Sequence, residues 1–94
     1  MSILKRIQQK VIDRDYYLSG HAEDEMWADG LDRVDVENAI LKGKIDKKLT
    51  KDIRGTRYRL EGAALDGRII HVVCRLNEKG ELIIVTLYAL EGGL

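Results

Sequence analysis

Apolar residues follow two different spacings along this chain, and the change falls near residue 44. Before that point they recur every three or four residues, which is typical of one buried face of a helix. After it they alternate with polar residues, which is typical of strands that bury one face. Helices followed by strands predict an α+β fold. The 94 residues suit a single domain over 1–94, with a helical part at about 2–43 and a sheet at about 44–90.

Three helices are predicted in the first part, at 2–13, 19–28 and 32–43. Each predicted helix begins at a residue whose side-chain oxygen can accept a hydrogen bond from a backbone N–H of the first turn. These residues are Ser2, Ser19 and Asp32. The second and third helices run into glycine, at Gly30 and Gly43, which favours helix termination.

Four strands are predicted in the second part, at about 45–50, 56–63, 68–76 and 81–90. Short connections join the last three, with Asp66-Gly67 in one and residues 77–80 in the other. Sequential strands with short connections form antiparallel pairs. We therefore expect N-terminal helices packed on one face of a four-stranded antiparallel meander sheet.

Alternation also predicts which strand residues face each other. A turn at 77–80 pairs three apolar positions of one strand with three of the next: Cys74 with Ile83, Val72 with Val85 and Ile70 with Leu87. The same register places His71 opposite Thr86, Ile69 opposite Tyr88 and Arg75 opposite Leu82. For the earlier pair, Tyr58 and Leu60 are expected beside Cys74 and Val72, because a one-residue slip would bury charged side chains.

The second face of this sheet is then polar and carries a histidine. Its expected members are Arg57, Arg59, Glu61, His71, Arg75, Thr86 and Tyr88. Metal-independent RNA cleavage needs a general base, a general acid and cations that stabilise the charged phosphate. His71, Arg59, Arg75 and Tyr88 are the candidate catalytic residues on this face, and His21 is a further candidate. The alternative is a structural His71, hydrogen-bonded to Thr86 or Glu61, with the arginines paired to carboxylates.

Composition limits the classes of protein to which this chain can belong. Sixteen basic and sixteen acidic residues cancel, which argues against binding nucleic acid by overall charge. The charges are nevertheless separated: residues 21–41 hold seven acids and one base, and residues 42–59 hold eight bases and two acids. A single cysteine, no apolar run of membrane-spanning length and no signal-peptide pattern at the start favour a cytoplasmic location.

Several ordered sequence blocks resemble a known family. They are Tyr17–Ala22 followed by Met26 and Gly30-Leu31, then Asp35–Ile40 with Gly43, and finally Ile84–Tyr88. Together they resemble the small bacterial domain-of-unknown-function family 4258. That family is similar to BrnT and RelE/ParE-like toxins, whose fold belongs with barnase-type and EndoU-type ribonucleases.

The resemblance implies a RelE-like fold and a ribonuclease toxin that acts on RNA, or an inactive relative. An antitoxin-like protein is an expected partner. Many members carry arginines in the helix after the histidine, where this chain has Glu25 and Asp29. The second function class is therefore a non-catalytic interaction or regulatory module on the same scaffold, including a homodimer.

Three other groups have both a functional and a structural interpretation. His21, Glu25 and Asp29 lie at helical spacing, so a divalent metal could use them, but a solvated surface is the simpler interpretation. We predict neither a metal nor a cofactor.

The basic residues that begin near residue 42 include the candidate RNA-binding residues Lys47, Lys48, Lys51, Arg54 and Arg57. The same residues equally suit a charged edge strand. Trp27 is a candidate for base stacking or packing, and Cys74 for an inert core position.

Overall fold

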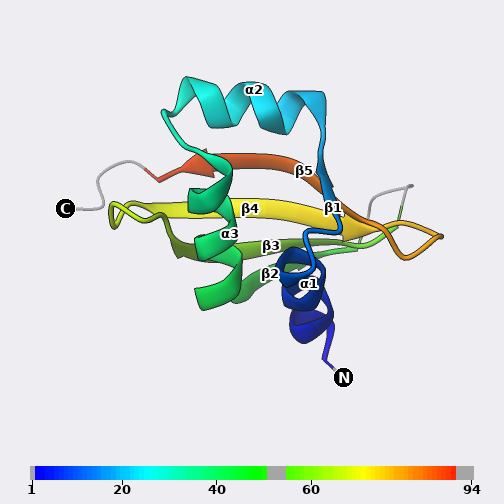
Figure 1. Cartoon of the computed structure of the whole chain (residues 1–94). Coiled ribbons are helices and arrows are strands. Elements are labelled where there is room, and N and C mark those ends of the chain that lie inside the picture. The colour runs from blue at the N-terminus through cyan, green and yellow to red at the C-terminus, as the bar shows by residue number, and fades with distance from the viewer. Residues whose placement is uncertain (1, 51–54, 91–94) are drawn as a thin grey trace.

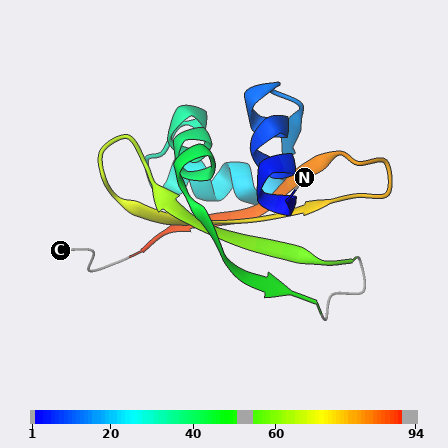
Figure 2. The same ribbon diagram turned by 90° about the horizontal axis from the view of Figure 1, so that it is seen from below.

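The computed structural model describes residues 2–50 and 55–90 of the chain and has three helices and five strands in the described part. Their order is α1 (Ile3–Ile12), β1 (Tyr16–Leu18), α2 (Gly20–Ala28), α3 (Arg33–Lys42), β2 (Lys44–Leu49), β3 (Arg57–Ala63), β4 (Ile69–Leu76) and β5 (Leu82–Ala89). Figures 1 and 2 show the helices on one side of the sheet, which confirms the α+β class. No helix of the described residues is long and apolar enough to cross a membrane.

The three helices begin where their capping residues predict. The Ser2 hydroxyl accepts a hydrogen bond from the Lys5 N–H at 3.1 Å, and the Ser19 hydroxyl accepts one from the Ala22 N–H at 3.0 Å. At the start of α3 the Asp32 N–H donates to the carboxylate of Asp35 at 2.8 Å. These contacts satisfy backbone groups that have no partner inside a helix.

The sheet has five strands rather than the four predicted, in the order β1-β5-β4-β3-β2. The additional strand, β1, pairs in parallel with β5, with Tyr16 opposite Leu82 and Leu18 opposite Ile84. The prediction of a wholly antiparallel sheet is therefore wrong. Three residues between two helices are too few to show alternation, so the strand left no periodic signal.

Strand register was predicted correctly for one hairpin and incorrectly for the other. Tyr58 lies opposite Cys74 and Leu60 opposite Val72, as expected. Between β4 and β5, however, a bulge between Val73 and Cys74 shifts the pairing, so Cys74 lies opposite Ile84 and Val72 opposite Leu87.

The bulge changes which β5 residues reach the core. Leu82, Ile84 and Leu87 are fully buried, whereas Ile83 and Val85 are only half-buried. His71 consequently lies opposite Tyr88 and not Thr86, Ile70 lies opposite Ala89, and Arg75 lies opposite Ile83. Alternation alone cannot show a bulge, because a bulge adds one residue to one strand only.

The core lies between the helices and one sheet face. Its largest buried side chains include Ile7, Met26, Ile40, Leu60 and Val72. Helix α3 packs very close to β3: a Cβ added at Gly62 would lie 2.1 Å from the Ala39 carbonyl oxygen. The other sheet face is not covered by any helix of the described chain (Figure 2).

Two carboxylates, from α2 and from the residue that follows it, cover the edge of β5 beyond the short strand β1. Glu25 accepts hydrogen bonds from the Thr86 hydroxyl and from the Leu87 N–H, and Asp29 accepts one from the Ala89 N–H at 3.0 Å. These side chains take the place of backbone acceptors that a neighbouring strand would supply. Glu25 and Asp29, which replace the arginines of many family members, therefore have a structural role.

Candidate functional site

Five polar side chains gather on the open face of the sheet, and we call them the open-face cluster. They come from four adjacent strands: Asp46 from β2, Arg59 and Glu61 from β3, His71 from β4 and Tyr88 from β5. Strand pairing brings them together, because Glu61 lies opposite His71 and His71 lies opposite Tyr88. Three of the five sequence-predicted catalytic residues, Arg59, His71 and Tyr88, are thus neighbours.

His71 is the most buried member, at 9% exposure. Its Nδ1 lies 3.1 Å from the Tyr88 hydroxyl, and the two rings meet edge to face with centroids 5.3 Å apart. Its Nε2 lies 3.8 Å from a carboxylate oxygen of Asp46 and 3.8 Å from one of Glu61. Tyr88 therefore fixes the ring, and Nε2 faces two carboxylates.

Arg59 is held against Asp46 by two contacts. Its Nε donates to Asp46 Oδ2 at 2.7 Å, and its Nη2 lies 2.5 Å from the same oxygen. The hydrogen bond from Arg59 lowers the pKa of Asp46 below its ordinary value, and the Asp46 partner raises the pKa of Arg59. Asp46 is consequently a carboxylate, and the guanidinium retains further N–H groups for another anion.

Asp46 is the member that sequence reasoning missed. The β2–β3 pairing shifts between Ile45 and Lys47, so that Asp46 is an extra residue beside Arg59. Such a bulge re-aims a side chain relative to simple alternation. Its charge could have identified it, because Asp46 is the one acid among the lysines of this strand.

The same cluster contains a group that could hold a metal ion. One ligand atom from each of Asp46, Glu61 and His71 lies within 4.8 Å of the other two. It is the sole group of this kind found in the described parts of the chain. The three atoms belong to three different strands, so no sequence spacing marks them.

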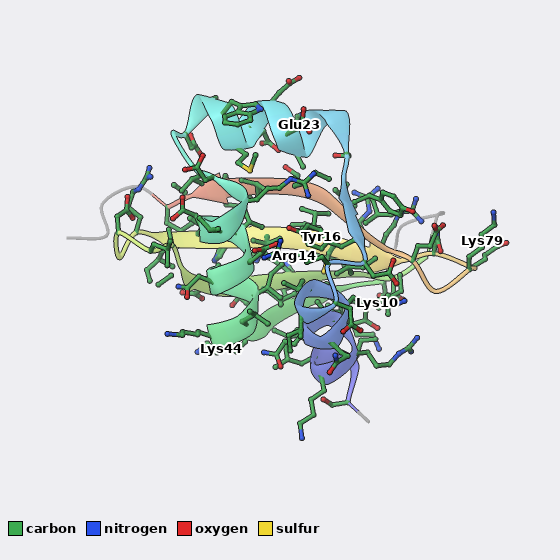
Figure 3. All side chains as sticks on the ribbon, viewed as in Figure 1. Lys10, Arg14, Tyr16, Glu23, Lys44 and Lys79 are labelled. Atoms are coloured by element: carbon green, nitrogen blue, oxygen red, sulfur yellow. The ribbon has the colours of Figure 1, made fainter. Side chains whose placement is uncertain are left out.

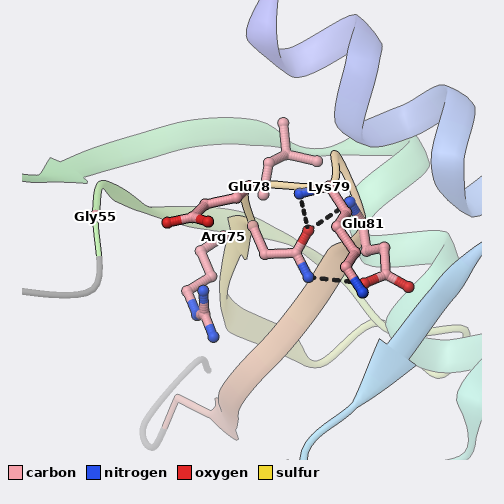
Figure 4. Close-up of a pocket in the computed structure, with 7 residues that line it drawn as sticks. Gly55, Arg75, Glu78, Lys79 and Glu81 are labelled. Atoms are coloured by element: carbon pink, nitrogen blue, oxygen red, sulfur yellow. Dashed lines mark hydrogen bonds between the residues drawn. The ribbon is translucent and has the colours of Figure 1, made fainter.

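Arg75 was predicted in the catalytic group, but it lies away from the open-face cluster. It is four residues further along β4 than His71, about 13 Å at the usual strand rise. There it lines an open pocket at the β4–β5 turn together with Gly55, Glu78 and other turn residues (Figure 4).

His21 also lies outside the open-face cluster. It belongs to the first turn of α2, its side chain is 72% exposed, and its Nε2 lies 3.2 Å from Glu25 Oε1. Because Glu25 and Asp29 bind the edge of β5, the set of His21, Glu25 and Asp29 is not free to bind a metal.

The candidate RNA-binding residues follow the edge of the sheet. Lys47 and Lys48 are exposed on β2, which is the edge strand, and Arg57 lies opposite Leu49 at the start of β3. Lys51 and Arg54 lie outside the described residues. Both earlier interpretations, an RNA guide and a charged edge, are compatible with this placement.

The remaining candidates divide between surface and core. Trp27 is 61% exposed, so it is not a core residue. Tyr16 is buried and donates to Glu37 at 2.5 Å; burial and this carboxylate raise the pKa of Tyr16 to about 12. Cys74 is fully buried, as predicted, and burial raises the pKa of its thiol to about 12.

A protein-family model described as Domain of unknown function (DUF4258) matches residues 18–89. The match covers well over half of the chain, so the chain belongs to this family. It runs from the last residue of β1 to the last residue of β5 and includes the whole open-face cluster. No curated protein and no solved structure matches the chain.

Proposed function

We propose that this member of the DUF4258 family is a metal-independent ribonuclease of the RelE/BrnT toxin type, and that the open-face cluster is its active site. The observation that carries the proposal is the setting of His71. A buried imidazole is fixed through Nδ1 by Tyr88, its Nε2 faces Glu61 and Asp46, and Arg59 is bound to Asp46. A general acid, a general base and a phosphate-binding cation are the three components that RNA cleavage needs.

The proposed reaction is an internal transfer at phosphorus. Glu61 takes the proton of the ribose 2′-hydroxyl, and the 2′-oxygen forms a bond to phosphorus. The bond from phosphorus to the 5′-oxygen breaks, and the imidazolium of His71 gives its proton to that oxygen. The products are a 2′,3′-cyclic phosphate and a free 5′-hydroxyl, so atoms and charge balance without a metal or a cofactor.

Arg59 supports the proposal because its remaining N–H groups can donate to the phosphate oxygens. Asp46 engages Nε and Nη2 through one oxygen, and the Tyr88 side chain also hydrogen-bonds to Arg59. A guanidinium has five N–H donors, so donors remain for a phosphate. Asp46 is then a positioning residue that holds Arg59 in the plane of the cluster. Such a fixed donor contributes because it needs little rearrangement when charge develops on the phosphate.

Substrate would extend beyond the cluster along charged parts of the surface. We assign Lys47, Lys48 and Arg57 on one side, and Arg75 on the other, to flanking phosphates. An arginine fork and a lysine ammonium both bind phosphate oxygens without reading base sequence. The proposed substrate is RNA in the cytoplasm, and the proposed partner is an antitoxin-like protein that covers this face.

Inducible expression tests the proposal in cells. Growth and RNA integrity are compared after induction of the wild type, His71→Ala and His21→Ala, with protein levels measured in parallel. Wild type and His21→Ala should arrest growth and fragment RNA, whereas His71→Ala should do neither. Equal behaviour of all three at equal expression would refute the proposal.

A second candidate is a non-catalytic interaction module, and exposed apolar side chains favour it. Trp27 is 61% exposed and Val34 is 52% exposed, on α2 and α3 respectively. Large exposed apolar residues are common where proteins associate. Light scattering of the purified chain would test self-association. A concentration-dependent dimer that Trp27→Ala abolishes, with no RNA cleavage by the wild type, would favour this second function.

A further inference from the structure

We infer that Asp46, Glu61 and His71 form a binding site for a divalent transition metal of the Zn²⁺ class, and that an occupied site is catalytically silent. The site is independent of the proposed ribonuclease, but its regulatory consequence rests on that function. Metal binding would engage Glu61 and His71, which the reaction needs as base and acid. The metal would therefore act as an inhibitor that shares the open-face cluster with substrate.

Distances between the ligand atoms are close to those of a metal site. Nε2 of His71 lies 3.8 Å from the nearest oxygens of both Asp46 and Glu61. Zinc binds nitrogen and oxygen at about 2.0–2.2 Å, which places tetrahedral ligand atoms roughly 3.3–3.5 Å apart. A movement of about half an ångström brings the imidazole and either carboxylate to that separation. The Asp46 and Glu61 side chains are 27% and 35% exposed, so they have room to make it.

The state of His71 is an independent indication of a ligand. The residue is buried with its side chain 11% exposed, and its Nε2 lies 3.8 Å from each of two carboxylates, which is beyond hydrogen-bond distance. Its Nδ1 is bound to the Tyr88 hydroxyl at 3.1 Å. In the neutral tautomer whose Nδ1–H donates to the Tyr88 hydroxyl, Nε2 presents a lone pair. Metal-binding histidines are oriented by such a contact at the second nitrogen.

Ligand chemistry favours zinc-like ions over magnesium and calcium. One imidazole nitrogen and two carboxylate oxygens suit Zn²⁺ and its neighbours, whereas Mg²⁺ and Ca²⁺ prefer oxygen ligands alone. Three protein ligands leave at least one coordination position for water. The two carboxylates carry two negative charges, which partly offset the cost of bringing a dication into the site.

Arg59 limits the affinity of this site. Both of its contacts fall on Oδ2 of Asp46, which is also the Asp46 oxygen 3.8 Å from His71 Nε2, so a metal at this oxygen competes with the guanidinium. A cation beside the site repels a second cation. The affinity should therefore be moderate in the wild type, and removal of the Arg59 charge should increase it.

Titration of metal-free protein with ZnCl₂, followed by calorimetry, tests the site directly. CoCl₂ with visible absorption provides a spectroscopic signal of the coordination. His71→Gln, Glu61→Gln and Asp46→Asn should each weaken binding at least tenfold, and Tyr88→Phe should weaken it by about tenfold. Arg59→Gln should strengthen it by about tenfold. His21→Gln is the matched control, since it removes the other histidine and should leave binding unchanged.

Two results would overturn the site: no binding to the folded wild type at millimolar metal, or binding that survives His71→Gln and disappears in His21→Gln. Circular dichroism establishes that each variant is folded.

The proposed inhibition by metal is tested by adding the same ZnCl₂ concentrations to an RNA-cleavage assay. A cleavage rate that falls in proportion to the fraction of metal-bound protein supports inhibition by the metal. An unchanged rate with the site fully occupied contradicts it. If metal-free protein does not cleave RNA, the proposed function fails while the binding result stands.

Discussion

Replacing Glu25 by alanine should destabilise the fold substantially, although Glu25 lies near the surface of α2. Its carboxylate accepts from the Thr86 hydroxyl and from the Leu87 N–H, and Leu87 is fully buried. Hydrogen bonds to charged groups contribute about 1.5–3 kcal/mol each, and an unsatisfied buried donor costs about 1–3 kcal/mol. The Leu87 contact is long at 3.3 Å, and the Glu25 side chain is 29% exposed, so water replaces part of the loss.

We therefore expect a net loss of about 2 kcal/mol. In a domain of this size each kcal/mol lowers Tm by about 4–8 °C, so Tm should fall by roughly 8–16 °C. Differential scanning calorimetry measures the shift, and urea titration gives the free energy of unfolding. The exposed ion pair with His21 contributes little of this, about 1 kcal/mol at most.

Two variants separate the hydrogen bonds from the change of charge. Glu23→Ala removes an exposed acid from the same helix (Figure 3) and should change stability by no more than about 0.5 kcal/mol. Glu25→Gln keeps an acceptor oxygen and should recover most of the loss. If Glu25→Ala and Glu23→Ala have the same small effect, the carboxylate does not cap the edge of β5 and the reasoning is wrong.

Three further predictions concern Cys74, Tyr16 and Gly62. Cys74 should react with Ellman's reagent only on global unfolding, because burial raises its pKa to about 12 and excludes the reagent; rapid reaction of the native protein would contradict this. The pKa of Tyr16 is also raised to about 12, so its neutral phenol stabilises the fold fully below pH 10 and this contribution disappears as the pH rises to about 12. Urea midpoints should therefore fall more steeply over this range in the wild type than in Tyr16→Phe. Gly62→Ala should cost about 3 kcal/mol or prevent folding, because its Cβ would meet the Ala39 backbone at 2.1 Å, whereas Gly20→Ala meets nothing within 4 Å and should fold normally.

Local sequence signals predicted most of the elements. Helical spacing with Ser2 and Ser19 as caps located the first two helices, and alternation located the four longer strands. The signal failed where structure depends on pairing between distant segments. Strand β1 has three residues, and only its contact with β5 defines it as a strand.

Bulges explain what the sequence could not predict about the site. The bulge in the β4–β5 pairing moved Tyr88 opposite His71, and the bulge in β2 brought Asp46 beside Arg59. An alternating pattern cannot account for an inserted residue, so Tyr88 was misplaced and Asp46 was missed, whereas Glu61 was expected beside His71. Glu25 was likewise interpreted from charge alone, because its bonds to β5 span about sixty residues of sequence.

The most direct test of the central claim is the initial rate of RNA cleavage by purified, EDTA-treated protein. Loss of a general acid or base lowers the rate by about 10²–10⁴-fold, so His71→Ala and Glu61→Gln should fall by that range. His21→Ala should keep the wild-type rate, and the products should carry 2′,3′-cyclic phosphate. A folded wild type that leaves RNA intact, or a His71→Ala variant as active as His21→Ala, would contradict the assignment of the open-face cluster as an active site.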